Sequence, residues 1–154
     1  MMKKNVLLLW KDIFNWRGHM NLRLKTNSDI EIKLGELQKW LHFSSKAAVM
    51  RLAICYSLRN KLDPRLKEGS ILHYDVKNQN GTDYLRSTVF GFNEELFKLL
   101  IIEYENRQVP DEEFFPEIIC AHITRGVNLL HSEYRFVNNR DKLMQKLINS
   151  VNEG

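Results

Sequence analysis

A glycine and two ionisable side chains interrupt the most apolar helical stretch of the chain. Ile118–Cys120 and Leu129–Leu130 flank a segment that contains His122, Arg125 and Gly126. Glycine in a helix interior costs about 1 kcal/mol relative to alanine, so it is retained where a close approach requires it. We therefore expect another helix to pack closely at Gly126, with His122 and Arg125 making polar contacts across the same seam. The pattern leaves open whether that helix belongs to this chain or to a second subunit.

The region after residue 20 has the period of a strand and then of a helix. Every second residue is apolar over residues 20–25, which is typical of a half-buried strand. Ser28 and Glu31 have the spacing of a capping box. They predict the start of an amphipathic helix that ends near Phe43.

A second helix is expected to form the centre of the core. Ser44 or Ser45 is its predicted cap, and it extends to about Asn60 with apolar side chains almost all round. Arg51 lies in its middle. Because an unpaired buried charge costs several kcal/mol, Arg51 must pair with an acidic group or reach the surface along its aliphatic stem.

The remainder of the chain is predicted to form a turn-rich segment followed by three helices. A turn at 78–81 lies between extended pieces at 71–76 and 84–90, which could pair as a hairpin or form an ordered loop. The next helix starts at Asn93 and is expected to bury Leu96, Leu99, Leu100 and Tyr104. A long helix starts at Pro116 and carries the interrupted stretch. The last helix, 141–151, is expected to bury Leu143, Met144, Leu147, Ile148 and Val151.

These patterns predict a mainly α fold, with one compact helical domain over residues 20–154. It opens with a short N-terminal strand and contains an irregular or hairpin segment near 70–90. Residues 1–19 form an N-terminal extension, and either Met1 or Met20 could be the start. The apolar run at 6–10 is shorter than a signal peptide, which needs about 7–15 apolar residues, or a membrane helix, which needs about 20. We therefore expect a cytoplasmic protein without a membrane segment.

Charge is distributed unevenly along the chain. Residues 1–67 contain fourteen basic and five acidic residues, whereas residues 68–154 contain nine basic and fourteen acidic ones. A basic half and an acidic half suggest a surface for a polyanion, although a solvated surface of uneven charge explains the same numbers.

Motifs for catalysis, cofactor binding and metal binding are not found in the sequence. It has no glycine-rich phosphate loop and no GxSxG elbow, and its histidines do not fall at metal-ligand spacings. Cys55 and Cys120 lie in apolar helical runs and are expected to be buried free thiols, although a Cys–His pair from distant parts of the fold stays open. We expect no enzyme activity, no cofactor and no metal.

The strand and the two helices that follow it have the order of a ribbon-helix-helix unit. In that arrangement paired strands of a dimer enter the major groove, so Asn21, Arg23 and Lys25 would face DNA. Lys46, at the start of the second helix, would meet a phosphate. The alternative is an edge strand whose charged outer face prevents aggregation.

Three segments together resemble the DndE family of bacterial DNA sulfur modification proteins. They are residues 51–58, 85–91 and 121–126, and the resemblance extends from Met20 to Tyr134. The chain departs from the family pattern at Phe92-Asn93, in its leader and in its tail. The family-motif residues are Arg51, Arg86, Thr88, Gly91, His122, Arg125 and Gly126.

The resemblance implies a small, helical, non-enzymatic subunit of the machinery that replaces a non-bridging phosphate oxygen of DNA with sulfur. It implies binding to duplex DNA, including nicked duplexes, and self-assembly into homo-oligomers such as tetramers. It also implies partner subunits, namely a cysteine desulfurase, an ATPase and a sulfurtransferase-like component. We therefore expect contacts to the sugar-phosphate backbone with little base preference. The alternatives are an adaptor that joins the other subunits without touching DNA, and a ribbon-helix-helix repressor.

Overall fold

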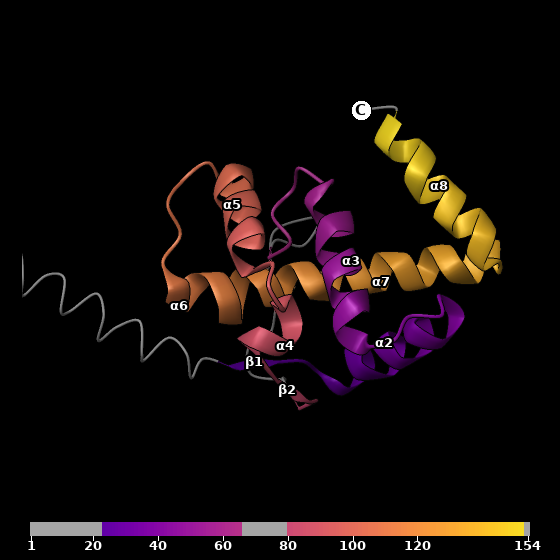
Figure 1. Ribbon diagram of the computed structural model, residues 1–154, viewed down its shortest axis with the longest axis horizontal. Helices are drawn as coiled ribbons and strands as arrows, with labels where there is room; N and C mark the ends of the chain where they lie inside the picture. The colour runs from indigo at the N-terminus through magenta and orange to yellow at the C-terminus, as the bar shows by residue number, and fades with distance from the viewer. Residues whose placement is uncertain (1–22, 66–79, 153–154) are drawn as a thin grey trace, which may run out of the picture.

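The computed structural model describes residues 23–65 and 80–152. The expectations for the N-terminal extension, for Asn21 and for the extended piece at 71–76 lie outside these residues. The described chain is mainly helical, as predicted, with one short two-stranded sheet (Figure 1).

One long helix runs through the whole molecule (Figure 1). It consists of α6 (Asp111–Glu113), the wider π-helical turn η2 (Phe114–Ile119) and α7 (Cys120–Val137). The helix begins five residues before Pro116, which was expected at its start. Pro116 lies instead inside the π-helical turn, because proline cannot donate the usual backbone hydrogen bond and its ring crowds the preceding turn.

Two N-terminal helices pack on the long helix: α2 (Ser28–Trp40) and α3 (Lys46–Leu58). The side chain of Asn27 caps α2 by accepting a hydrogen bond from the Ile30 amide at 2.8 Å, so the predicted capping box at Ser28 was wrong. Ser45 caps α3 in the same way, through the amide of Ala48 at 3.2 Å. Both caps satisfy amide groups that have no partner within the helix.

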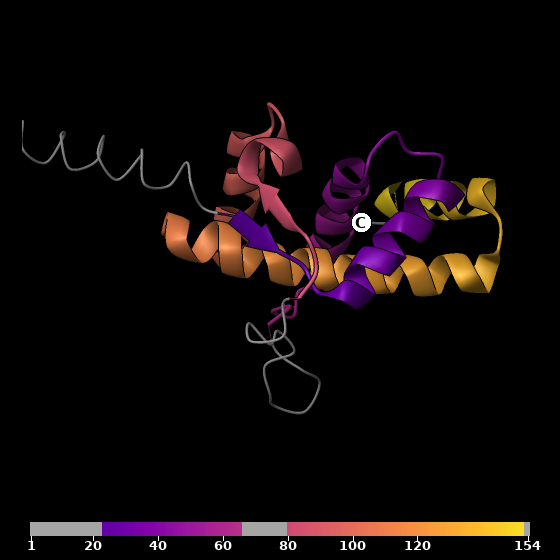
Figure 2. The same ribbon diagram turned by 90° about the horizontal axis from the view of Figure 1, so that it is seen from below.

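The strand β1 (Arg23–Lys25) pairs antiparallel with β2 (Asp83–Leu85) of the same chain. Figure 2 shows the two strands side by side against the N-terminal part of the long helix. Leu24 is fully buried beneath the pair. The extended piece expected at 84–90 ends at Leu85, because α4 (Arg86–Phe90) follows at once and buries Val89 and Phe90 in the core.

The prediction for α5 (Glu94–Glu105) was half right: Leu100 packs partly against the core and Tyr104 packs on His122, but Leu96 and Leu99 do not face the core. The buried residues of α5 are Phe97 and Ile101, whereas Leu96 and Leu99 are 54% and 63% exposed. Phe97 packs on Phe90, with ring centroids 5.3 Å apart. This aromatic contact decides the orientation of the helix, because aromatic rings bury more apolar area than leucines.

The last helix, α8 (Arg140–Asn152), folds back from the end of α7 toward α3 (Figure 1). Leu143 is fully buried, and Met144 and Leu147 pack partly against the core. Ile148 and Val151, which were expected to be buried, are 63% and 70% exposed. None of the described helices is long and apolar enough to cross a membrane.

Candidate functional site

Gly126 lies against the backbone of α3. A Cβ atom at this position would come within 1.9 Å of the Ala53 carbonyl oxygen, which no real structure allows. The close approach expected at Gly126 is therefore confirmed, and the neighbouring helix belongs to the same chain. We call this contact between α3 and α7 the glycine seam.

His122 and Arg125 make their polar contacts across the glycine seam. The Nδ1 atom of His122 lies 2.9 Å from the Ser57 hydroxyl, and the Nε atom of Arg125 donates to the same hydroxyl at 2.7 Å. Arg125 also donates to the carbonyl oxygens of Ser57, Asn60 and Leu62. Its guanidinium group thus satisfies carbonyls at the C-terminal end of α3, where a positive charge also complements the helix dipole.

His122 is fully buried and held in its neutral form. Burial, with the nearby charge of Arg125, lowers the pKa of His122 to about 3. The Tyr104 ring packs edge-on against the imidazole, with centroids 5.0 Å apart. Among the described residues, no group hydrogen-bonds to its Nε2 atom. These contacts enclose the imidazole between α3, α5 and α7.

Three further family-motif residues, Arg51, Gly91 and Thr88, differ in their surroundings. Arg51 donates to the Val89 carbonyl oxygen at 2.8 Å, so its partner is a backbone oxygen rather than the acidic group considered from the sequence. Gly91 has a φ of +58°, a conformation that favours glycine, although a Cβ there would meet nothing within 4 Å. Thr88 is exposed.

Arg86 joins α4 to two acidic residues and two aromatic rings. Its Nε atom donates to Glu94 at 2.6 Å, and its Nη1 atom lies 3.7 Å from Asp111. The guanidinium carbon also lies 5.9 Å and 5.4 Å from the ring centroids of Phe114 and Phe115. Arg86 therefore connects α4, α5 and the start of the long helix.

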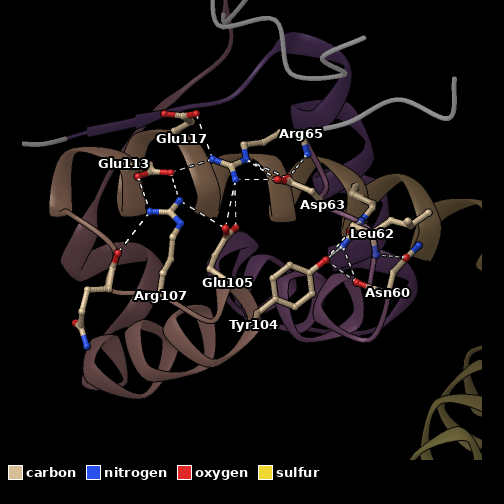
Figure 3. Close-up of polar contacts among 11 residues, drawn as sticks. Asn60, Leu62, Asp63, Arg65, Tyr104, Glu105, Arg107, Glu113 and Glu117 are labelled. Carbon is tan, nitrogen blue, oxygen red and sulfur yellow. Dashed lines mark hydrogen bonds and ion pairs between the residues drawn. The ribbon is translucent and has the colours of Figure 1, made fainter. Parts of the chain in front are cut away.

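A network of ion pairs ties the segment after α3 to α5 and to the long helix (Figure 3). The guanidinium of Arg65 lies 2.8 Å from Asp63, 3.1 Å from Glu113 and 3.4 Å from Glu105. Although burial raises the pKa of Asp63, hydrogen bonds from Arg65 outweigh it and lower that pKa below its ordinary value. Sequence reasoning missed this network, because its members are far apart in the chain.

The predicted DNA-contacting residues do not share one environment. Arg23 and Lys25 are exposed on the outer face of β1, where Lys25 lies opposite Asp83 in the strand register. Lys46 pairs with Glu31 at 2.9 Å, and its contact with a phosphate stays a prediction. Burial raises the pKa of Glu31, but hydrogen bonds from Thr26, Lys46 and Tyr84 outweigh this effect and lower the pKa.

An open groove between α8 and the C-terminal end of α3 was not predicted. It has a volume of about 430 Å³. It is lined by Tyr56, Arg59, Asn60, Leu129, Lys146, Leu147 and Ser150. A second hollow of about 410 Å³ continues it along α8 and is lined by Lys142, Gln145, Lys146, Asn149 and Ser150. We call the two together the α3–α8 groove. Sequence reasoning did not find this groove, because α3 and α8 are far apart in the chain.

The two cysteines differ in exposure. Cys120 is buried as expected, whereas Cys55 is exposed, so the prediction of two buried thiols was half wrong. In the part of the chain that the structure describes, no group of three or more His, Cys, Asp or Glu side chains could hold a metal ion.

Comparison with known proteins shows the family of the chain. The family described as "DNA sulphur modification protein DndE" matches residues 23–138. A crystal structure of DndE from Escherichia coli B7A, described as involved in DNA phosphorothioation modification, is similar in fold, with a TM-score of 0.55 and 19% sequence identity. The similarity covers 72% of this chain and 97% of that one. No curated protein sequence matches the chain.

Proposed function

Because this chain belongs to the DndE family of DNA sulphur modification proteins, we propose that it is a non-enzymatic, DNA-binding subunit of the cytoplasmic phosphorothioation machinery. It contacts the sugar-phosphate backbone of duplex DNA, including nicked duplexes, with little base preference. Its partners are the other components of that machinery, an ATPase and a sulfurtransferase-like protein among them.

The observation that carries this proposal is the exposure of Arg23 and Lys25 on β1. Cations on an exposed face suit phosphate contacts, which position a protein on DNA without reading its sequence. A repressor of the ribbon-helix-helix type has less support, because β1 already pairs with β2 of its own chain rather than with a partner's strand. The non-enzymatic role is supported by the enclosure of His122 in the glycine seam.

A gel-shift experiment with the isolated protein tests the proposal. Nicked, intact and randomised duplexes of equal length are compared at low salt. Comparable binding to all sequences is expected. A preference of about 10³ or more for one sequence would instead indicate a repressor. Failure to bind any duplex would overturn the DNA-binding role.

The adaptor, which would join other subunits without touching DNA, remains a second candidate. Separately, an exposed apolar surface at the start of α5 favours contact with another protein molecule. Leu96 and Leu99 lie one turn apart on α5 and are exposed, and Phe92, in the turn just before this helix, is fully exposed. An exposed apolar stripe of this kind is typical of a protein interface. We assign the stripe to self-association into a homo-oligomer, such as a tetramer, and call it the α5 stripe.

A further inference from the structure

We infer that the α3–α8 groove binds a short single-stranded stretch of DNA. The inference rests on the proposed DNA-binding function and adds a location and a strand form to it. Residues 139–154 lie beyond the residues that match the family, so the α8 wall of the groove belongs to a part of this chain outside that match.

The size of the groove suits one strand better than a duplex. Its two hollows, of about 430 and 410 Å³, are adjacent, because Lys146 and Ser150 line both. A volume of this order holds a few nucleotides of one strand, whereas a duplex, whose major groove alone is about 12 Å wide, is too broad to enter it.

The charge of the groove is positive. Arg59, Lys142 and Lys146 line it, and none of the described residues that line it is acidic. Glu133, just outside it, forms an ion pair with Lys146 at 2.6 Å, so the net positive charge of the lining comes from Arg59 and Lys142. Asp141 is also nearby in sequence, and it lies 3.4 Å from Arg140. A phosphodiester backbone that entered the groove would thus meet cations without an opposing carboxylate on the walls.

The other lining residues suit nucleobases. The Arg59 guanidinium lies over the Tyr56 ring at the α3 wall, with its carbon 5.6 Å from the centroid, so a base can stack on the planar guanidinium that the ring supports. Asn60, Gln145 and Asn149 provide amide groups that can pair with base edges. An acidic peptide would use the cations but gain little from the ring and the amides, so the observations favour a polynucleotide.

A charge reversal that spares the fold tests the inference. Lys142 is exposed in the first turn of α8, and its backbone amide donates to the Asn139 side chain at 2.9 Å. Lys142→Glu places an acid where the helix dipole and a capping box favour it, so the helix is retained. Lys39→Glu changes the net charge equally at an exposed position on α2, outside the groove, and is the control; because an acid in the last turn of α2 opposes the helix dipole, its melting temperature is measured alongside.

The full-length protein is titrated with a fluorescent oligothymidylate of about 12 nucleotides, and separately with a duplex. Lys142→Glu is expected to weaken single-strand binding about tenfold, and Lys39→Glu to change it little. Tyr56→Leu, which changes no charge, is also expected to weaken it about tenfold through lost stacking.

If Lys142→Glu and Lys39→Glu lose equal affinity for the oligothymidylate, the groove assignment is wrong. It is also wrong if the wild-type protein binds the duplex but not the oligothymidylate. Both results leave duplex binding, and so the proposed function, intact. Displacement of the oligothymidylate by polyglutamate at equal charge concentration would overturn the choice of DNA in favour of an acidic peptide. Binding to neither DNA form would instead refute the proposed function.

Discussion

At the scale of single residues, the close contact at Gly126 predicts that even a methyl group there destabilises the protein. In Gly126→Ala the new Cβ would collide with the Ala53 carbonyl, so α3 and α7 must separate, at a cost of about 1–3 kcal/mol or more. Gly35→Ala is the matched control, because a Cβ on this helical glycine of α2 meets only the Lys46 side chain, at 3.9 Å. That change should stabilise the protein by about 0.5–1 kcal/mol.

Urea unfolding of the two variants gives the free energies directly. Opposite signs are expected, with Gly126→Ala less stable and Gly35→Ala more stable than the wild type. Because the seam lies within one chain, Gly126→Leu should lower stability or prevent folding, rather than yield a folded monomer in light scattering. A Gly126→Ala protein of wild-type stability would contradict the close packing.

The buried His122 predicts a dependence of stability on pH. Its pKa is about 3 in the folded protein and about 6.5 when exposed, so the unfolded chain binds more protons between these values. The neutral imidazole therefore supports folding above about pH 6.5, and this support is lost as the pH falls toward 3. Between about pH 6.5 and 5 the loss should approach 2 kcal/mol.

Unfolding of wild type and His122→Gln at a series of pH values isolates this contribution. The variant is expected to lose less stability than the wild type over the same pH range, whatever its absolute stability. Parallel curves for the two proteins would show that His122 does not titrate in this range.

At the scale of elements, α5 shows where periodicity alone is insufficient. The helix has two apolar faces, and the sequence does not state which one meets the core. The face with Phe97 and Ile101 is buried because the Phe90 ring packs on it, and Phe90 comes from a helix that sequence reasoning took for an extended piece. The face of Leu96 and Leu99 is left to solvent.

The segment 84–90 was mispredicted for a related reason. Thr88 and Val89 are β-branched and favour a strand locally. Burial of Val89 and Phe90 and the ion pairs of Arg86 override that preference. By contrast, the strand at 23–25 and the caps and cores of α2 and α3 depend on local patterns, so the sequence predicted them closely except for the identity of the α2 cap.

The α5 stripe predicts self-association. Leu96→Glu with Leu99→Glu should lower the molar mass of the particle in multi-angle light scattering, because two charges cannot be buried against a second copy at low cost. The melting temperature of the subunit itself should change little, since both leucines are more than half exposed. Ile32→Glu, at an equally exposed position on α2, is the control and should leave the mass unchanged. An unchanged mass in the double variant would exclude the stripe as the oligomer contact.

At the scale of the whole molecule, the number of basic residues in the N-terminal half overstates the positive charge available at the surface. Several cations of the basic half are already engaged: Lys46 with Glu31, Arg51 with a backbone oxygen, and Arg65 with its acidic network. The acidic half is similarly concentrated around α5 and the start of the long helix, where Arg65 and Arg107 pair with Glu113. The α3–α8 groove joins residues near 60 to residues near 146, a meeting that only the fold reveals.

The salt dependence of duplex binding shows whether Arg23 and Lys25 touch phosphates. Each neutralised phosphate contributes about −0.9 to the slope of log affinity against log salt, because counterions are released. Arg23→Gln with Lys25→Gln should therefore reduce the magnitude of the slope by about 1.8, without lowering thermal stability. Lys39→Gln with Arg135→Gln removes two exposed charges elsewhere and should leave the slope near that of the wild type. Equal slopes for the β1 variant and the wild type would show that β1 does not contact the phosphates of the duplex. A wild-type affinity that does not depend on salt would exclude binding through phosphates altogether.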